Sequence, residues 1–188
     1  MRRALLVVLG LALAACGHEP LPVLGEVPDF ALVDQDGAPV AAGDLEGGPW
    51  VADFVFTRCP DVCPAITATM KGLERDLAAE GADVTLVSIS VDPAHDTPPV
   101  LREYATRFGA GPRWRFLTGS RDAVAALVKD GFKLGFADDG PPTAPITHSD
   151  RFVLVDGQRR IRGYYRSREP HEMARLAADA RRLADETT

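Results

Sequence analysis

Two strongly apolar runs constrain the fold of this chain more than any other feature. Residues 50–56 read WVADFVF and residues 84–92 read VTLVSISVD. Continuous β-branched runs of this kind are typical of strands buried on both faces. After the first run, apolar residues at helical spacing from Ile66 to Leu77 predict a helix, which Gly81 ends. Strands that alternate with helices in this way predict an α/β sheet covered by helices on both faces.

The remaining segments extend this sheet. Residues 29–45 contain two short apolar runs around Asp36-Gly37, which predicts an N-terminal β-hairpin. The other predicted elements are a helix opened by Thr97 and Pro98, a strand at 114–119, a helix capped by Ser120, a hairpin over 152–166 and a last helix from Pro170. We therefore expect a central mixed sheet flanked by helices, in one domain over residues 29–186.

The N-terminus carries an export signal. Residues 1–15 combine two arginines with an apolar run that is too short to cross a bilayer as a helix, so we predict a signal peptide. Leu13 to Cys16 read LAAC and resemble the lipobox of bacterial lipoproteins, which predicts that Cys16 is lipidated. The proline-rich residues 16–28 then form a lipidated tether, with His18 solvated within it.

The charge of the exported chain argues against nucleic acid as a partner. Removal of residues 1–15 takes away two of the 21 basic side chains and leaves 27 acidic ones, so the net charge is 19 − 27 = −8 with neutral histidine. A surface with this balance repels phosphate backbones, and no cluster of lysine and arginine counteracts it. We expect no nucleic-acid binding.

The remaining two cysteines form a CxxxC pair in FTRCPDVCP, residues 56–64. A disulfide over so short a loop constrains few unfolded conformations and adds little stability, so a purely structural role is disfavoured. Pro64 predicts that a helix begins there, with Cys63 as its cap and Cys59 in the preceding loop. The helix N-terminus favours the thiolate form of Cys63. Thiolates attack disulfides and also bind metals, so position alone leaves both roles open.

A third ligand would distinguish the roles, because thiolates together with imidazole suit copper(I) or zinc. Of the remaining histidines, His171 lies at the start of the last helix, where a surface or capping role is expected. His95 lies in SVDPAHDTP, on a loop after a strand. His148 lies in THSDRFVLVD, on a loop that enters a strand. A solvated side chain is the ordinary alternative for each.

Three spaced motifs change this balance. FTRCPDVCP, SVDPAHDTP and THSDRFVLVDGQ, in this order, resemble the SCO/SenC family of copper proteins over about residues 24–185. The resemblance implies a thioredoxin-like fold, anchored at a bacterial membrane and facing the periplasm, with the cytoplasmic membrane favoured. It implies a metallochaperone that helps assemble the dinuclear copper centre of cytochrome c oxidase, by copper delivery, by thiol reduction, or by both.

By motif position, the resemblance implies that Cys59, Cys63 and His148 bind one copper ion as copper(I), with copper(II) as a second state. The two cysteines also form a redox pair that can close to a disulfide. Asp92 matches the family's acidic residue near the site, where it supports the ligands or recognises a partner; its alternative is a turn residue before Pro93. The implied partners are the copper-bearing subunit of the oxidase and other periplasmic copper chaperones or thiol reductants. His95 departs from the family pattern, which leaves open a fourth, weaker ligand.

The main alternative is a periplasmic thiol–disulfide oxidoreductase without a copper-transfer role. Such proteins generally use CxxC and a proline before the strand that faces the cysteines, whereas this chain has three residues between its cysteines and Ser149 to Arg151 before that strand. A peroxiredoxin is disfavoured because its threonine and proline are absent at the required positions. A structural zinc site would need a fourth protein ligand, and no residue pairs obviously with the other three.

Overall fold

The computed structural model describes residues 19–59, 62–137 and 146–187. Its centre is an eight-stranded mixed sheet with the order β1-β10-β9-β4-β5-β6-β2-β3. The strands are β1 (Gly25–Glu26), β2 (Ala31–Asp34), β3 (Pro39–Ala41), β4 (Trp50–Val55), β5 (Thr85–Ser90), β6 (Trp114–Thr118), β9 (Arg151–Val155) and β10 (Arg160–Arg166). A separate two-stranded sheet pairs β7 (Phe136–Ala137) with β8 (Thr147–His148).

The middle of the sheet is parallel and its edges are antiparallel. Strands β4, β5 and β6 run in the same direction, while β9 lies antiparallel to β4, and β2 lies antiparallel to β6. Strands β4 and β5 are buried along almost their whole length, as expected for continuous apolar runs covered on both faces. The predicted central mixed sheet is therefore confirmed.

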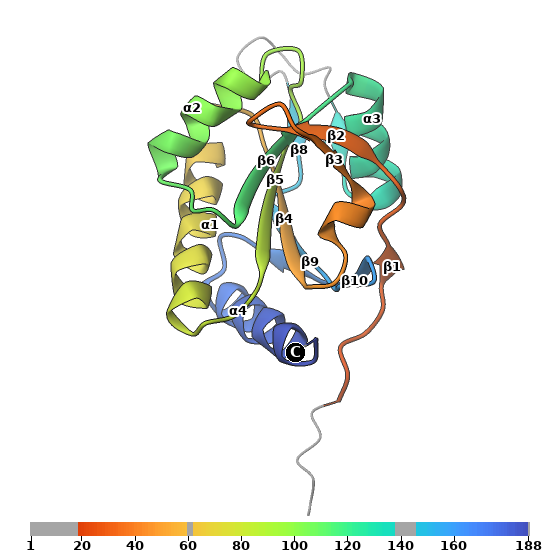
Figure 1. The fold of residues 1–188 in the computed structure, drawn as a ribbon, viewed down its shortest axis with the longest axis vertical. Helices are drawn as coiled ribbons and strands as arrows, with labels where there is room; N and C mark the ends of the chain where they lie inside the picture. The colour runs from red at the N-terminus through yellow and green to blue at the C-terminus, as the bar shows by residue number, and fades with distance from the viewer. Residues whose placement is uncertain (1–18, 60–61, 138–145, 188) are drawn as a thin grey trace, which may run out of the picture.

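Helices cover both faces of this sheet (Figure 1). The helices are α1 (Val62–Ala79), α2 (Pro98–Phe108), α3 (Arg121–Ala126), α4 (Pro170–Asp185), the 3-10 turn η1 (Ala42–Leu45) and the π-helical turn η2 (Leu127–Gly131), which continues α3. Helices α1 and α2 lie on one face, with α4 packed on α1 and β10, and α3 lies on the other. Among the described residues, no helix has the length and apolar character needed to cross a membrane.

The predicted hairpin and capping signals are present. Strands β2 and β3 pair around Asp36-Gly37, where Gly37 adopts a φ of 81°, a left-handed value that favours glycine. The Ser120 side chain accepts a hydrogen bond from the Ala123 amide and caps α3. The last hairpin, β9–β10, turns at Asp156-Gly157 as predicted.

The start of the first helix and the path of the tether differ from the sequence prediction. The first helix begins at Val62, two residues before the predicted start, because a proline in the first turn has no intrahelical hydrogen bond to lose. Residues 25–26, within the predicted tether 16–28, form strand β1 on the edge of β10. Residues 1–15 and Cys16 lie outside the described residues.

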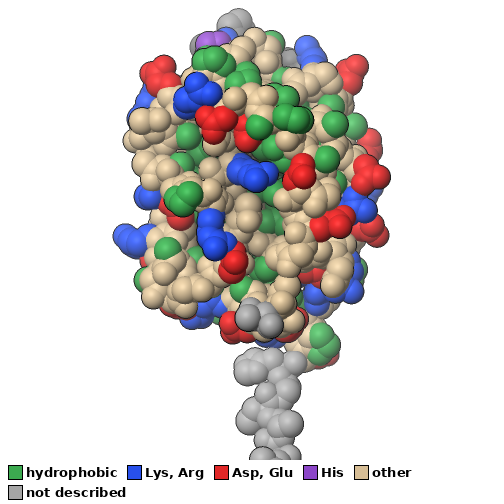
Figure 2. Space-filling model, viewed as in Figure 1, with side chains coloured by type: hydrophobic (Ala, Val, Ile, Leu, Met, Phe, Trp, Pro, Cys, Tyr) green, Lys and Arg blue, Asp and Glu red, His purple; other side chains and the backbone are tan. Residues whose placement is uncertain are grey.

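The strand ends that lead to the predicted site and the point where the chain enters lie at opposite ends of the domain. The carboxyl ends of β4 and β5, the start of α1 and strand β8 lie at one end, and the chain enters the domain at the other, where α4 ends (Figure 1). Acidic and basic side chains are interspersed over the face drawn in Figure 2, without a broad field of one sign. The first of these ends contains the predicted site.

Candidate metal centre

Three segments bring the predicted ligands to the carboxyl end of β4. Cys59 lies in the turn that follows this strand, where its amide donates a hydrogen bond to the Phe56 carbonyl at 3.2 Å. Cys63 lies in the first turn of α1 and is completely buried. His148 comes from β8, which is held by pairing of His148 with Phe136. His148 is 85 residues from Cys63 in sequence, but the fold brings it to the cysteine pair.

The thiol of Cys63 and the imidazole of His148 are in contact. Nε2 of His148 lies 3.4 Å from Sγ of Cys63. Nδ1 of His148 lies 3.0 Å from the Ser149 carbonyl, which can only accept, so Nδ1 carries the proton and Nε2 keeps its lone pair. The ring also packs edge-on against Phe56, with centroids 5.7 Å apart. The imidazole ring is thus held in one orientation, with the lone pair of Nε2 directed at the Cys63 sulfur.

The second thiol lies close to the first. Sγ of Cys59 accepts a hydrogen bond from the Cys63 amide at 3.3 Å, so this sulfur satisfies one of the amides that every helix leaves without an intrahelical partner. Both residues are present as thiols. Among the described residues, no three histidine, cysteine or acidic side chains stand in a ready-made coordination geometry.

Burial sets the electrostatics of the two contacting ligands. It raises the pKa of the Cys63 thiol, with contributions in the same direction from Cys59 and Asp53, and a backbone hydrogen bond at Phe56 offsets only part of this. The expectation that the helix N-terminus favours a thiolate at Cys63 is therefore wrong for this state, because desolvation outweighs the dipole. Burial also lowers the pKa of His148, so its imidazole is neutral and able to coordinate a metal.

Asp92 is linked to the candidate site through Arg58. Its carboxylate accepts hydrogen bonds from Nε and Nη2 of Arg58 at 3.0 and 2.6 Å, and Arg58 directly precedes Cys59. Its carbonyl also accepts the amides of His95 and Asp96. Asp92 thus forms both an ion pair beside the site and the turn that the alternative interpretation described. The side chain of His95 is exposed.

Asp96 is a residue that the sequence interpretation did not single out. It is completely buried and accepts hydrogen bonds from the Thr57 amide at 3.1 Å, the Thr57 hydroxyl at 2.6 Å and the Ser90 hydroxyl at 2.6 Å. These bonds tie the turn before Cys59 to the end of β5. The available signal was the second acidic residue of SVDPAHDTP, next to the helix start at Pro98.

Asp53 was missed as well. It is fully buried within β4, and among the described residues neither of its carboxyl oxygens makes a hydrogen bond. Burial raises its pKa to about 7, and the nearby Ser88 hydroxyl offsets part of this effect without reaching hydrogen-bond geometry. Its negative charge contributes to the raised pKa values of Cys63 and Tyr104. An aspartate within the apolar run WVADFVF was the signal in the sequence.

Comparison with known proteins identifies relatives of this chain. The family model described as SCO1/SenC matches residues 23–185. The "SCO1 protein homolog" of Bacillus subtilis is 36% identical over 149 residues, which cover 77% of this chain and 77% of that protein. A SCO1/SenC family lipoprotein from Bacillus anthracis has a similar structure, with a TM-score of 0.80 and 34% identity over 87% of this chain and 97% of the other.

Two further structures carry functional information in their descriptions. BsSco, described with a disulfide switch and as a member of the Sco family of cytochrome c oxidase assembly proteins, has a TM-score of 0.80 and 31% identity over 89% of this chain and 98% of its own. Bradyrhizobium japonicum ScoI with copper bound has a TM-score of 0.72 and 26% identity over 85% of this chain and 99% of its own. The thioredoxin-like fold of these Sco proteins confirms the predicted fold class.

Proposed function

This chain belongs to the SCO1/SenC family, and on that premise we propose that it is a membrane-anchored metallochaperone for the dinuclear copper centre of cytochrome c oxidase. Cys59, Cys63 and His148 bind one copper ion as cargo. The observation that carries this proposal is the contact of 3.4 Å between Cys63 Sγ and His148 Nε2, with the other ring nitrogen held by a backbone carbonyl. A fixed imidazole next to a thiol is a preorganised pair of metal ligands.

The donor set fits copper(I). Thiolate sulfur is a soft ligand that selects copper(I), and imidazole accepts copper in either oxidation state. Copper binding displaces the thiol protons, so the copper–thiolate bonds offset the cost of deprotonating Cys63, whose pKa is raised by burial. The carboxylate of Asp92 is a hard ligand and is already paired with Arg58, so its role is to support the turn beside the site or to recognise a partner.

The same thiols support reduction of the target's cysteines. Sγ of Cys59 lies against the Cys63 amide, so the two sulfurs are close along the chain and in space. Formation of a disulfide between them releases two electrons and two protons, which convert a partner disulfide to two thiols. Delivery of copper and reduction of the oxidase cysteines are therefore compatible steps at one site. A thiol–disulfide oxidoreductase without copper transfer is the alternative function, favoured by the same proximity.

The anchor and the partners complete the proposal. We infer that Cys16 is lipidated and holds the domain at the periplasmic face of the cytoplasmic membrane; a lipoprotein among the structural relatives supports this. There the site meets the copper-bearing subunit of the oxidase, and other periplasmic copper chaperones or thiol reductants supply copper or electrons. A site at the carboxyl end of the parallel strands is a common position for function in an α/β sheet.

Titration with copper(I) tests the metal site. The reduced chain, kept anaerobic, is titrated against a competing chelator, together with Cys59→Ser, His148→Ala and the control His171→Ala, whose side chain is 76% exposed. We expect one tightly bound copper ion in the parent and the control. Loss of a ligand should weaken binding by more than the roughly 10–100-fold cost of losing an outer hydrogen-bond partner.

The state of the thiols separates the two functions. Oxidation of Cys59 and Cys63 to a disulfide should abolish tight copper binding, because it consumes both thiolates. Tight binding that survives oxidation would instead indicate a site of histidines and carboxylates. Weak binding that neither Cys59→Ser nor His148→Ala changes would favour the oxidoreductase, and the reduction potential of the cysteine pair would then define its function.

A further inference from the structure

The N-terminal segment lies on the domain instead of extending away from it. The Leu24 amide donates a hydrogen bond to the Ile161 carbonyl at 2.8 Å, and the Val27 amide donates to the Arg159 carbonyl at 2.9 Å. These bonds flank the pairing of β1 with β10. Arg182 of α4 also donates to the Glu19 carbonyl at 3.2 Å. Residues 19–27 are therefore held along one edge of the sheet.

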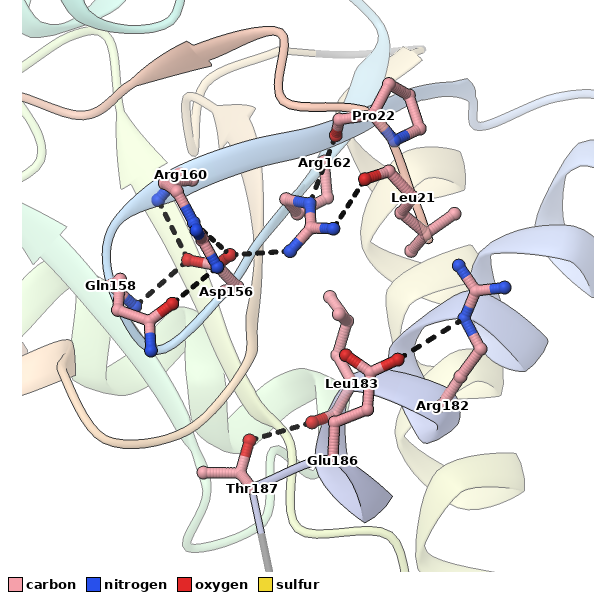
Figure 3. Close-up of polar contacts among 10 residues, drawn as sticks. All are labelled: Leu21, Pro22, Asp156, Gln158, Arg160, Arg162, Arg182, Leu183, Glu186 and Thr187. Carbon is pink, nitrogen blue, oxygen red and sulfur yellow. Dashed lines mark hydrogen bonds and ion pairs between the residues drawn. The ribbon is translucent and has the colours of Figure 1, made fainter. Parts of the chain in front are cut away.

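A buried ion pair holds the start of this segment (Figure 3). Arg162 donates from Nε to the Pro22 carbonyl at 3.0 Å, from Nη2 to the Leu21 carbonyl, and from Nη1 to Oδ2 of Asp156 at 2.7 Å. The side chains of Arg162 and Asp156 are each only 7% exposed. The planar guanidinium suits this arrangement, because its donors point in fixed and different directions.

Further hydrogen bonds satisfy the buried carboxylate of Asp156. It also accepts hydrogen bonds from Nε of Arg160 at 2.8 Å and from the amides of Gln158 and Arg160 at 2.9 and 3.0 Å. Burial raises the pKa of Asp156, but these bonds and the one from Arg162 outweigh it, so the pKa is lowered overall. The aspartate therefore remains charged and keeps Arg162 directed at the backbone of the segment.

The segment enters at the end of the domain opposite to the candidate metal centre (Figure 1). Three residue steps separate Cys16 from Glu19, which span at most about 10 Å even when extended. A compact domain of this length is about 40 Å across. The exposed large hydrophobic side chains of the described residues, Val23 at 58% and Leu24 at 51%, lie on this same segment. Apolar side chains next to a lipid attachment point fit the interfacial region of a bilayer.

We propose that the Arg162–Asp156 pair clamps residues 19–27 to the domain, so that a lipid on Cys16 holds the end bearing Val23 and Leu24 against the bilayer. The candidate metal centre is then presented away from the membrane, toward a partner domain that projects above it. This inference rests on the anchor of the proposed function. The clamp itself does not depend on copper or on the lipid.

Hydrogen exchange tests the clamp. The full chain, in vesicles of phosphatidylethanolamine and phosphatidylglycerol, is compared with Arg162→Met and with the control Arg160→Met. The control removes the other arginine from Asp156 and leaves both bonds from Arg162 to the segment in place. We expect the Leu24 and Val27 amides to exchange at least about tenfold faster in Arg162→Met, because two charge-assisted bonds to their segment are lost. They should be unchanged in Arg160→Met. Unchanged exchange in Arg162→Met would overturn the clamp.

A second variant keeps the test decisive if Arg162→Met fails to fold. Arg162→Lys retains a positive charge beside Asp156 but lacks the planar fork that reaches both carbonyls. Faster exchange at Leu24 and Val27 in this variant, with protected amides in β4, supports the clamp. Exchange at the parent rate in Arg162→Lys shows that charge alone suffices and overturns the assignment of the two carbonyl bonds.

Fluorescence quenching tests the orientation. A dye is attached to Asp185→Cys, near the entering segment, or to Ala94→Cys, near the metal centre, in chains that carry Cys59→Ser and Cys63→Ser, with a quencher on the lipid headgroups. We expect strong quenching at position 185, little at position 94, and loss of this contrast with Arg162→Met. Equal quenching at both positions in the clamped chain would overturn the orientation.

The mass of the N-terminal peptide tests the lipid anchor separately. An unmodified Cys16 would refute both the anchor and the orientation, while the exchange experiment would still decide the clamp.

Discussion

Asp53→Asn is the substitution whose effect on stability follows most directly from the structure. The Asp53 side chain is fully buried in the central strand β4, and among the described residues it makes no hydrogen bond. Its pKa is raised from 3.8 to about 7, chiefly because burial removes water from the carboxylate. Asparagine has nearly the same shape but no titration, so the substitution removes this electrostatic cost without opening a cavity.

The magnitude follows from proton linkage. Between pH 3.8 and about 7, the folded state keeps a proton on Asp53 that the unfolded state releases. Stability therefore falls as pH rises through this window, and the loss is complete above the folded pKa. A shift of about three pKa units corresponds to about 4 kcal/mol at 1.36 kcal/mol per unit. From about pH 5 to about pH 8, the same relation gives a change of about 2–3 kcal/mol.

Urea unfolding at these two pH values measures the effect. The free energy of unfolding of Asp53→Asn should increase by about 2–3 kcal/mol relative to that of the parent chain on going from about pH 5 to about pH 8, because only the parent loses stability in this range. The control Asp76→Asn, at a side chain that is 58% exposed, should show no such trend. Parallel pH dependences of Asp53→Asn and the parent would refute a raised pKa at Asp53.

Three further predictions follow from other contacts. Asp96→Ala should increase the alkylation rate of Cys59 and weaken copper(I) binding by about tenfold or more, because the preceding turn loses its hydrogen-bond acceptor; unchanged values in both assays would contradict this role. His148→Gln should remove a loss of stability as pH falls below 6.5, because the folded pKa is lowered and the unfolded state binds the proton more tightly; urea unfolding against pH checks this. Gly157→Ala should lower the free energy of unfolding by about 1–3 kcal/mol, since its Cβ would lie 3.0 Å from the Gly48 amide nitrogen, and a stability equal to the parent's would contradict that contact.

Most of the fold was readable from the sequence because strong local signals agreed with the global arrangement. The apolar runs of β4 and β5, the hairpin at Asp36-Gly37 and the cap at Ser120 each have a local physical cause. The two-residue strands β1, β7 and β8 were not predicted, because so short a segment has no periodicity. Their pairing depends on the backbone edge offered by a partner strand.

The candidate site was readable only in part. Motif order indicated Cys59, Cys63 and His148, while the bond from His148 to the Ser149 carbonyl required the structure. The direction of the Cys63 pKa could not be derived from its position at a helix start, because desolvation depends on the residues that cover the thiol. The hydrogen bonds of Asp96 join residues 57 and 90, a long-range contact that no local pattern encodes.

The sequence by itself determined the fold class and the order of the main elements, and it predicted a signal peptide and the candidate ligands Cys59, Cys63 and His148. The elements follow from periodicity and turn residues, which act over a few neighbouring residues, whereas the candidate ligands follow from the resemblance of three spaced motifs to the SCO/SenC family. Only the tertiary structure decided that Asp53 and Cys63 are desolvated and that Arg162 donates hydrogen bonds to the carbonyls of residues 21 and 22. It also decided that the chain enters the domain opposite to the candidate metal centre. Burial and long-range hydrogen bonding arise when distant segments pack, so their energetic consequences appear only once the chain is folded.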